Sequence, residues 1–247
     1  MRKDLCGKRA LVTGSGRGIG SAIALELAAA GAEVVLHYLG DESSVKSVRE
    51  SIEAAGGRCG IAQANLSIRE EACQLMDKAG PVDILVLNAS VQIRKPWREI
   101  TLEEYEVQMS CNFLSSLLLI QRAAPNMQRN RWGRIITIGS VQEAKPHPDM
   151  LVYSASKAAQ TMMVKSLALQ LAGDGITVNN VAPGVINTDR NKDALSDPVY
   201  AQKVKDSIPM GFFGEKEDCA GLVRLLCSEE GRYITGQSIY VDGGKGL

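Results

Sequence analysis

The residues with the clearest chemical potential are Tyr153 and Lys157, four positions apart in the segment YSASK. In a helix, residues four apart project from one face, so the two side chains would lie next to each other. A lysine ammonium beside a phenol favours the phenolate and lowers the tyrosine pKa from about 10 toward neutral, as an acid/base catalyst requires. This spacing also arises by chance, so the assignment depends on the neighbouring segments.

Two further polar residues stand where such a catalyst could use them. Ser140 ends the predicted strand RIITIGS shortly before Tyr153, and ligands gather at the carboxyl ends of parallel strands. Its hydroxyl could orient a substrate carbonyl. Asn112 precedes the apolar run FLSSLLLI in a predicted helix, where a buried amide would need hydrogen-bond partners. The alternative for Asn112 is an exposed position on that helix.

A glycine-rich turn near the start of the chain predicts an anion site. The predicted strand RALV runs directly into TGSGRGIG, residues 13–20, and then into a helix. Glycines let the backbone turn sharply and approach a pyrophosphate, and the following helix offers unpaired N–H groups at its positive end. The spacing is neither GxGxxG nor a Walker loop, and the alternative is a plain tight connection between strand and helix.

The end of the second predicted strand bears on the choice between NAD and NADP. An acidic residue there would hydrogen-bond the 2′-hydroxyl of the NAD ribose and repel the 2′-phosphate of NADP. The strand ends in LHYL, residues 36–39, without a carboxylate, while Arg17 in the glycine loop could face a phosphate. NADP(H) is therefore favoured, and NAD(H) stays possible because Asp41 and Glu42 follow closely.

The elements that must position these residues follow an alternating order. Short Val-, Ile- and Leu-rich runs are separated by longer amphipathic stretches, and the runs are continuously apolar, as in parallel strands covered on both faces. We expect one α/β domain with a doubly wound parallel sheet flanked by helices. The predicted strands are ALVT, EVVLHY, CGIAQ, DILVLN, RIITIGS, ITVNNVAP and SIYVDGG, and the predicted helices cover 19–30, 43–55, 70–78, 102–127, 152–171 and 216–227.

The least regular segment lies between the last two predicted strands. It contains Asp197-Pro198 and Pro209, and it separates two periodic elements. A long connection in a compact α/β domain is more often a lid or binding loop than a structural necessity. We therefore place a substrate lid at about 189–213, with a plain surface excursion as the alternative.

Composition narrows the partners and the chemistry. The 28 basic residues balance the 28 acidic ones, so no overall field attracts nucleic acid or an anionic membrane. Six scattered cysteines without a CxxC pair and two isolated histidines do not match the spacing of a metal site. The first residues lack a secretory signal and no apolar run could span a bilayer, so we expect a cytoplasmic protein that acts on a small molecule.

With these segments in place, almost the whole chain resembles the compact type of short-chain dehydrogenase/reductase, which implies one Rossmann-like domain over residues 1–247. TGSGRGIG matches the family's TGxxxGxG loop, YSASK its YxxxK pair, and VAPGVINT its PG segment. Asn65-Leu66 matches the adenine-contacting pair. Asn88-Ala89-Ser90 matches the NNAG element, with Leu87 and Ser90 as departures. The motifs follow one another in the family's order.

The resemblance implies interconversion of a secondary alcohol and a ketone by hydride transfer with NAD(P)(H). It implies a catalytic tetrad of Asn112, Ser140, Tyr153 and Lys157. Tyr153 would be the general acid or base, Ser140 would polarise the carbonyl, Lys157 would bind the nicotinamide ribose and lower the tyrosine pKa, and Asn112 would hold a water. The expected cofactor contacts are Gly14, Ser15, Arg17, Gly18, Ile19, Gly20, His37, Tyr38, Asn65, Leu66, Asn88, Ala89, Tyr153, Lys157, Pro183, Gly184, Ile186 and Thr188.

The substrate is less determined. GRIITIGSV, GITVNNVAPG and YITGQSIYVDGG are similar to 3-oxoacyl-[acyl-carrier-protein] reductases. Such an enzyme needs basic residues for its acidic carrier protein, and Arg129, Arg131 and Arg134 could serve. Asp174, in the turn before GITVN, argues against this partner.

The segment after Ser140 favours a different substrate. It offers Gln142, Glu143 and His147 as hydrogen-bond partners, and buried polar groups select substrates that can pair with them. We expect a small polar alcohol or ketone, such as a sugar acid or polyol, with the carrier-protein reductase as the alternative. Side chains that merely solvate a loop would carry no such preference.

Two further expectations concern the whole chain. A non-catalytic dinucleotide-binding sensor or scaffold is the alternative from another class, because a fold by itself does not imply activity. The intact tetrad favours an enzyme. The resemblance also implies a homotetramer assembled through the helices near 101–127 and 152–171, where Leu114, Leu117 and Leu118 could supply apolar contacts or could face the sheet.

Overall fold

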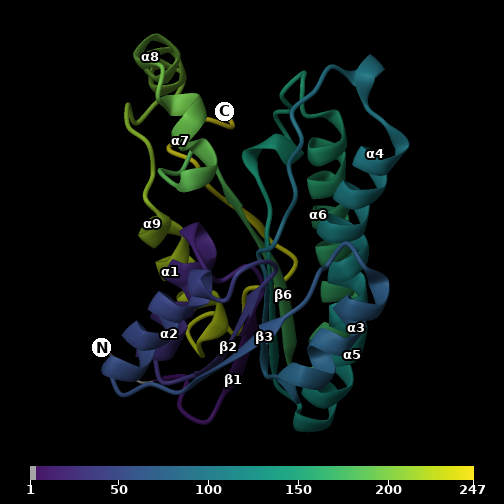
Figure 1. The fold of residues 1–247 in the computed structure, drawn as a ribbon. Helices are drawn as coiled ribbons and strands as arrows, with labels where there is room; N and C mark the ends of the chain where they lie inside the picture. Colours follow the sequence, from purple (N-terminus) through teal and green to yellow (C-terminus); the bar gives the residue numbers. More distant parts are fainter. Residues whose placement is uncertain (1–3) are drawn as a thin grey trace.

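The computed structural model describes residues 4–247, with residues 193 and 194 described by their backbone alone. Seven parallel strands form one sheet in the order β3-β2-β1-β4-β5-β6-β7, which confirms the predicted doubly wound α/β class (Figure 1). The strands are β1 (Arg9–Val12), β2 (Glu33–Tyr38), β3 (Cys59–Gln63), β4 (Ile84–Leu87), β5 (Gly133–Ile138), β6 (Ile176–Pro183) and β7 (Ser238–Val241).

Helices cover both faces of this sheet (Figure 1). One core packs α1, α2 and α9 against the sheet and a second core packs α3, α5 and α6 against the other face, so neighbouring strand residues such as Leu11 and Val12 belong to different cores. This two-sided burial explains the continuously apolar strands. No described helix is long and apolar enough to cross a membrane. The helices are α1 (Gly18–Ala29), α2 (Ser43–Ala54), α3 (Arg69–Ala79), α4 (Leu102–Met109), α5 (Ser115–Asn130), α6 (Leu151–Leu171), α7 (Asp189–Leu195), α8 (Pro198–Asp206) and α9 (Lys216–Cys227).

The strand order reverses at β1. β1 pairs with β2 on one side and with β4 on the other, so successive connections run away from this point in opposite directions. Such a reversal opens a crevice at the carboxyl ends of the strands. The glycine loop leaves β1 there, and the segments that follow β4, β5 and β6 border the same edge.

The helix predicted over 102–127 is interrupted. Instead of one helix, α4 and α5 are joined by a π-helical turn over Ser110–Leu114. The Ser115 hydroxyl donates to the carbonyl of Cys111 at 2.6 Å, and the Ser116 hydroxyl donates to the carbonyl of Asn112 at 3.1 Å, so side chains compete for backbone acceptors at this point. Single π-helical turns often mark functional sites, and this one contains Asn112.

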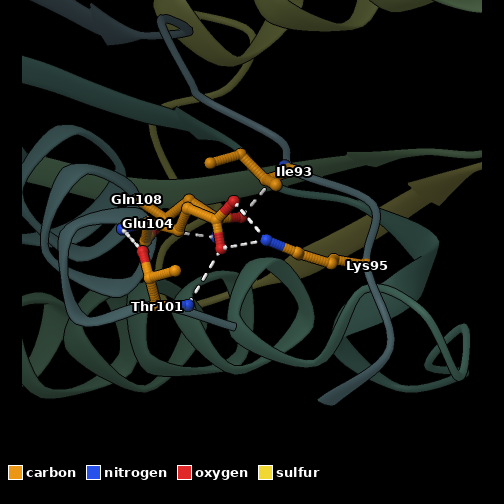
Figure 2. Close-up of polar contacts among 5 residues, drawn as sticks. All are labelled: Ile93, Lys95, Thr101, Glu104 and Gln108. Atoms are coloured by element: carbon orange, nitrogen blue, oxygen red, sulfur yellow. Dashed lines mark hydrogen bonds and ion pairs between the residues drawn. The ribbon is translucent and has the colours of Figure 1, made fainter. Parts of the chain in front are cut away.

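The loop between β4 and α4 is anchored at the start of α4 (Figure 2). The Glu104 carboxylate accepts hydrogen bonds from the Lys95 ammonium at 2.9 and 3.2 Å and closes a capping box with Thr101. The Gln108 side chain accepts a hydrogen bond from the backbone N–H of Ile93 at 3.1 Å. These bonds hold the preceding part of the loop, which forms a wall of the cavity described below.

The segment predicted as a lid is a distinct excursion above the carboxyl edge of the sheet (Figure 1). It contains α7 and α8, and a parallel β-bridge between Ile186 and Gly214 closes its base. The N–H of Asn187 donates to the carbonyl of Gly214 at 2.8 Å. The segment 189–213 thus contains two short helices, and its role as a substrate lid stays a prediction.

Candidate active site

A cavity of about 780 Å³ runs along the carboxyl edge of the sheet. One end lies at the glycine loop between β1 and α1, and the other lies at Ser140 and Tyr153, bordered by the start of the lid. Of the predicted site residues, those that line this cavity are Gly14, Arg17, Gly18, Ile19, His37, Tyr38, Asn65, Leu66, Asn88, Ala89, Ser140, Gln142, His147, Tyr153, Pro183, Gly184, Ile186 and Thr188.

The glycine loop has the shape that a pyrophosphate needs. Gly14 and Gly18 adopt φ values of +64° and +58°, a region that other residues rarely occupy. A Cβ on Gly16 would lie 2.8 Å from the Ser44 hydroxyl oxygen. The loop leads straight into the N-terminus of α1, where unpaired N–H groups and the helix dipole favour an anion.

His37 braces this loop with both of its ring nitrogens. Its Nδ1 accepts a hydrogen bond from the N–H of Gly14 at 2.9 Å, and its Nε2 lies 3.0 Å from the carbonyl of Ala64. Because a backbone N–H only donates, Nδ1 is unprotonated and Nε2 carries the proton. Burial lowers the pKa of His37 to about 4 and so keeps the ring neutral. His37 lines the cavity, but both ring nitrogens are engaged by backbone groups, and its expected contact with the cofactor stays a prediction.

Ser15 and Gly20, predicted to contact the cofactor, lie behind the cavity surface. Ser15 is fully buried, and its hydroxyl accepts a hydrogen bond from the N–H of His37 at 2.9 Å. A Cβ on Gly20 would come 2.3 Å from the carbonyl oxygen of Gly14. Both residues thus shape the loop. Asn88 ties the same loop to the end of β4 by donating to the carbonyls of Thr13 and Gly14 at 2.9 and 3.0 Å.

The end of the cavity that is expected to hold the adenosine is bordered by a cation, Arg17, and an acid, Asp41. β2 ends at Tyr38, as predicted, so Asp41 belongs to the following loop. The Asp41 carboxylate accepts from the hydroxyl of Ser43 at 2.7 Å and from its N–H at 3.1 Å, and these bonds lower the pKa of Asp41. Arg17 borders the same part of the cavity. The acid and the cation thus both border the cavity, and the acid is also engaged at the start of α2.

Ser140 and Tyr153 meet beyond the carboxyl end of β5. Ser140 starts the turn after the strand, where its hydroxyl accepts a hydrogen bond from the N–H of Gln142 at 3.2 Å. The pKa of Tyr153 lies above its usual value, because burial raises it more than the charge of Arg190 and the contact with Ser140 lower it. The sequence predicted a pKa lowered by Lys157, and in the structure the burial of the phenol outweighs such an effect.

Lys157 lies one turn further along α6 and is almost completely buried. Its ammonium is 5.8 Å from the centroid of the Tyr153 ring, and it donates to the carbonyl of Ile138 at 2.7 Å and to the side chain of Gln160 at 3.2 Å. Burial, assisted by the charge of Arg190, lowers the pKa of Lys157 to about 7. Its charge therefore changes near neutral pH, close to the phenol.

Asn112 is fully buried, so it does not occupy an exposed helix position. Its Oδ1 accepts from the N–H of Val91 at 2.8 Å, and its Nδ2 donates to the carbonyl of Val91 at 2.9 Å and to the hydroxyl of Ser156 at 3.0 Å. The amide thereby joins the loop after β4 to α6, directly before Lys157. Its predicted contact with a water stays a prediction.

The three predicted substrate contacts separate into two groups. Gln142 and His147 line the cavity. Glu143 instead directs its carboxylate toward β6 and β7, where it accepts hydrogen bonds from the Asn180 amide at 3.0 and 3.2 Å and from the Ser238 hydroxyl. We therefore remove Glu143 from the expected substrate contacts, because its oxygens are held on the side away from the cavity.

The structure adds a residue pair that the sequence reasoning missed. The Arg190 guanidinium, on α7, donates through Nη1 to the Ser90 hydroxyl at 3.0 Å and through Nη2 to the Ser90 carbonyl at 2.9 Å. The positive charge of Arg190 also acts on Tyr153, where it lowers the pKa of the phenol, and both residues line the cavity. Two features of the sequence could have indicated this pair. Ser90 replaces the glycine of the family motif, and Arg190 lies at the start of the predicted lid.

The cavity fits a nicotinamide dinucleotide. The loop at Gly14 and Gly18 suits a pyrophosphate, Asn65 and Leu66 line the side next to β3, and the segment 183–188 lines the end near Tyr153. A Cβ on Gly184 would come 2.7 Å from the Cα of Asp242, so the PG segment packs closely against the turn after β7. A doubly wound sheet with this crevice and a buried Ser-Tyr-Lys group defines the nicotinamide-dependent oxidoreductases as the class.

The chain belongs to the short-chain dehydrogenase/reductase family and is an NAD(P)-dependent oxidoreductase that acts on CH–OH groups. The family model described as "Enoyl-(Acyl carrier protein) reductase" matches residues 14–245. The 3beta-hydroxysteroid dehydrogenase 1 of Eggerthella lenta is 38% identical over 252 residues, which span 100% of this chain and 97% of that protein.

Two solved structures share the fold closely. A 3-oxoacyl (acyl-carrier-protein) reductase from Agrobacterium tumefaciens C58 with NADP bound has a TM-score of 0.94 and 38% identity, covering 98% of this chain and 95% of that one. A putative NAD(P) dependent gluconate 5-dehydrogenase from Beutenbergia cavernae with bound NADP has a TM-score of 0.93 and 33% identity, covering 99% of both chains. The relatives thus share the scaffold but differ in substrate.

Proposed function

We propose that this chain interconverts a small polar ketone and its secondary alcohol, with NADP(H) as the preferred cofactor. The polar lining at the catalytic end of the cavity carries this proposal. Ser90, Gln92, Gln142, His147 and Arg190 all border that end. Several of these side chains already bond within the protein, as Gln142 does with Ser154 and His147 does with Arg94. Their remaining donors and acceptors suit a sugar acid or polyol better than a hydrocarbon.

In the proposed mechanism Tyr153 moves the proton. During reduction the substrate carbonyl oxygen accepts hydrogen bonds from Ser140 and Tyr153, and the phenol gives its proton to this oxygen. During oxidation the phenolate takes the proton from the alcohol. A bound nicotinamide supplies or takes up the hydride. Lys157, when protonated, favours the phenolate through its charge and holds the nicotinamide ribose.

Asn112 acts on the reaction through other groups in this proposal. Its amide fixes Val91 in the loop after β4 and Ser156 in α6, and Ser156 directly precedes Lys157. Asn112 is therefore a positioning residue for the proton-transfer group. A water held by this residue, as the family resemblance implies, would extend the proton path from Lys157.

The preference for NADP(H) rests on charge at the adenosine end. Arg17 and Asp41 both line the cavity there. The guanidinium would attract a 2′-phosphate and the carboxylate would repel it. The proposal gives more weight to Arg17, because Asp41 lies beyond the end of β2 and already accepts two hydrogen bonds from Ser43. The relatives from Agrobacterium tumefaciens and Beutenbergia cavernae are described with NADP bound, which supports the same preference.

A substrate panel run with each cofactor tests the proposal. The panel compares acetoacetyl thioesters with sugar acids and polyols, and kcat/KM is measured with NADP(H) and with NAD(H). We expect turnover of polar substrates and higher kcat/KM with NADP(H). Fast turnover of the thioester alone would contradict the polar substrate class.

The alternative function is reduction of a 3-oxoacyl group on a carrier protein, which the Agrobacterium relative's name suggests. The basic residues expected to receive the carrier lie at the amino end of β5, opposite the edge that holds Ser140. Arg134 is buried and pairs with Glu229 at 3.3 Å, and Arg131 pairs with Asp174 at 2.9 Å. Within one chain these arginines do not border the cavity, so the polar small-molecule substrate is the better supported function.

A further inference from the structure

Arg190 holds a fixed position at the catalytic end of the cavity. It is the second residue of α7, yet its guanidinium reaches back to the end of β4, where two of its N–H groups bond to Ser90. Two bonds to one residue fix both the place and the plane of the guanidinium. The lid and the sheet are therefore joined by a cation, and that cation borders the cavity.

The cation lies beside the reacting position. Arg190 and Tyr153 line the same cavity, and the charge of Arg190 acts on the phenol, which is the group that the proposed mechanism assigns to the substrate oxygen. A guanidinium has five N–H donors. Ser90 engages two of them, so three remain for a ligand. A substrate oxygen bound to Tyr153 would thus lie near unused donors on a positive charge.

The other cations at this end have different partners. The Lys145 ammonium donates to the carbonyls of Lys245 and Leu247 at 2.8 and 3.1 Å, and Lys245 bonds to the hydroxyl of Ser207. Among the described residues lining this end, Asp189 is the nearby acid, against the basic Arg190, Lys145 and Lys245. The residues lining this end therefore carry more positive than negative charge, and the charge of Arg190 acts on Tyr153 against that of Glu143, which does not line the cavity.

We propose that Arg190 binds a carboxylate of the substrate, placed one or two bonds from the reacting carbon. The substrate would then be a 2-oxo or 3-oxo acid or the matching hydroxy acid. This inference rests on the proposed function and narrows its substrate class. Because Arg190 and Tyr153 line the same cavity, a carboxylate close to the reacting carbon can reach the guanidinium while the carbonyl oxygen meets the phenol. A carboxylate further along the chain lies further from the reacting carbon, and the series below tests this difference.

The test uses a series in which only the carboxylate position changes. The probes are 2-oxobutanoate, 3-oxobutanoate, 4-oxopentanoate and 5-oxohexanoate, each compared with its methyl ester as the ratio of the two kcat/KM values. We expect a ratio of at least tenfold for the first two acids and a ratio near one for 5-oxohexanoate. The ratio cancels any change in the phenol, because acid and ester share Tyr153.

The matched variants are Arg190→Met and Lys192→Met. Lys192 lies two residues further along α7, is exposed and is not among the residues lining the cavity, so its loss removes the same charge from the same helix. We expect Arg190→Met to lower the ratio at least tenfold for the 2-oxo and 3-oxo acids, Arg190→Lys to retain part of it, and Lys192→Met to leave it within twofold.

Three outcomes would overturn the inference: no turnover of any oxo acid by the parent, a ratio that is largest for 5-oxohexanoate, or an unchanged ratio in Arg190→Met. If Arg190→Met does not fold, Ser90→Gly decides, because it removes one bond that fixes the guanidinium and should lower the ratio severalfold. The proposed function fails separately, when neutral polar ketones and the esters are also not turned over.

Discussion

At the scale of residues, the proposed proton transfer depends on the hydroxyl of the buried Tyr153. Burial raises the pKa of the phenol, and the neighbouring Arg190 and Ser140 lower it. Lys157, with its pKa lowered to about 7, changes charge in the pH range where the enzyme works. The single hydroxyl thus depends on groups from β5, α6 and the lid.

We expect Tyr153→Phe to lower kcat by about 10²–10⁴-fold, because the ring is kept while the proton donor is lost. Hydride transfer is followed by nicotinamide absorbance, and cofactor binding and thermal unfolding are compared with the parent as controls. A variant that turns over like the parent would exclude Tyr153 as the acid/base group. Loss of activity would also argue against a non-catalytic sensor.

At the scale of elements, the glycine loop is held by the end of β2. Both nitrogens of His37 bond to backbone, one to the loop itself and one to the segment after β3. The loop geometry therefore depends on a neutral imidazole. A positive ring would lose its acceptor for the N–H of Gly14 and place an unpaired charge in the core.

We expect stability to fall in acid through His37. Its pKa is about 4 in the folded chain and about 6.5 when unfolded, so below pH 6.5 the unfolded state binds the proton first. The stability that His37 contributes is complete above pH 6.5 and is lost as the pH falls toward 4. Urea unfolding at pH 7, 6 and 5 should show a smaller loss in His37→Gln, and equal losses would contradict this assignment.

A second prediction at this scale concerns the contact of the Ser140 turn with β6 and β7. The Glu143 carboxylate accepts from Asn180 and Ser238, and Asn180 also accepts from the hydroxyl of Thr137 in β5 at 2.7 Å. Glu143→Ala removes the carboxylate that accepts from both groups, although the Asn180 amide keeps the Ser238 hydroxyl as an acceptor at 2.8 Å. The free energy of unfolding should fall by about 1–3 kcal/mol. Glu143→Gln keeps one acceptor and should cost less. Chemical denaturation measures both, and equal stability of all three proteins would refute the role.

At the scale of the whole molecule, the helices α4 to α6 present apolar side chains to solvent. Tyr105, Leu151, Met162 and Leu169 are exposed, with Leu169 reaching 87%. Leu118, by contrast, packs against the core on its own sheet face. Leu118 therefore stabilises the core of its own chain, whereas the exposed apolar side chains of α4 and α6 are available for contact between chains.

We expect a homotetramer in solution, with a mass four times the 26.5 kDa of one chain. Leu169→Glu places a charge in the exposed apolar surface of α6 and should shift the population toward smaller species. Light scattering during size-exclusion chromatography measures the mass. Ser47→Glu, at an exposed neutral position on α2, is the control for an added negative charge, and a parent that runs as a monomer would contradict the tetramer.

The sequence by itself determined the elements and their order. Continuous apolar runs, helix periodicity and the glycine loop depend on local residue types, which is why the strands and most helices lie where they were predicted. The sequence also predicted that the glycine loop, Ser140 and the YSASK helix lie at one edge of the sheet, because parallel strands end at the same edge. The sequence did not predict the π-helical turn, because this turn depends on side chains that compete for backbone hydrogen-bond acceptors.

Only the tertiary structure decided which way the polar side chains point. Glu143 was expected to contact the substrate, and its carboxylate instead bonds to β6 and β7. His37 was expected to contact the cofactor, and its ring nitrogens instead hold the glycine loop. Arg190 meets Ser90 across 100 positions of sequence. Such contacts depend on how strands and the lid are placed in space, and a local pattern records neither distance nor direction between segments this far apart.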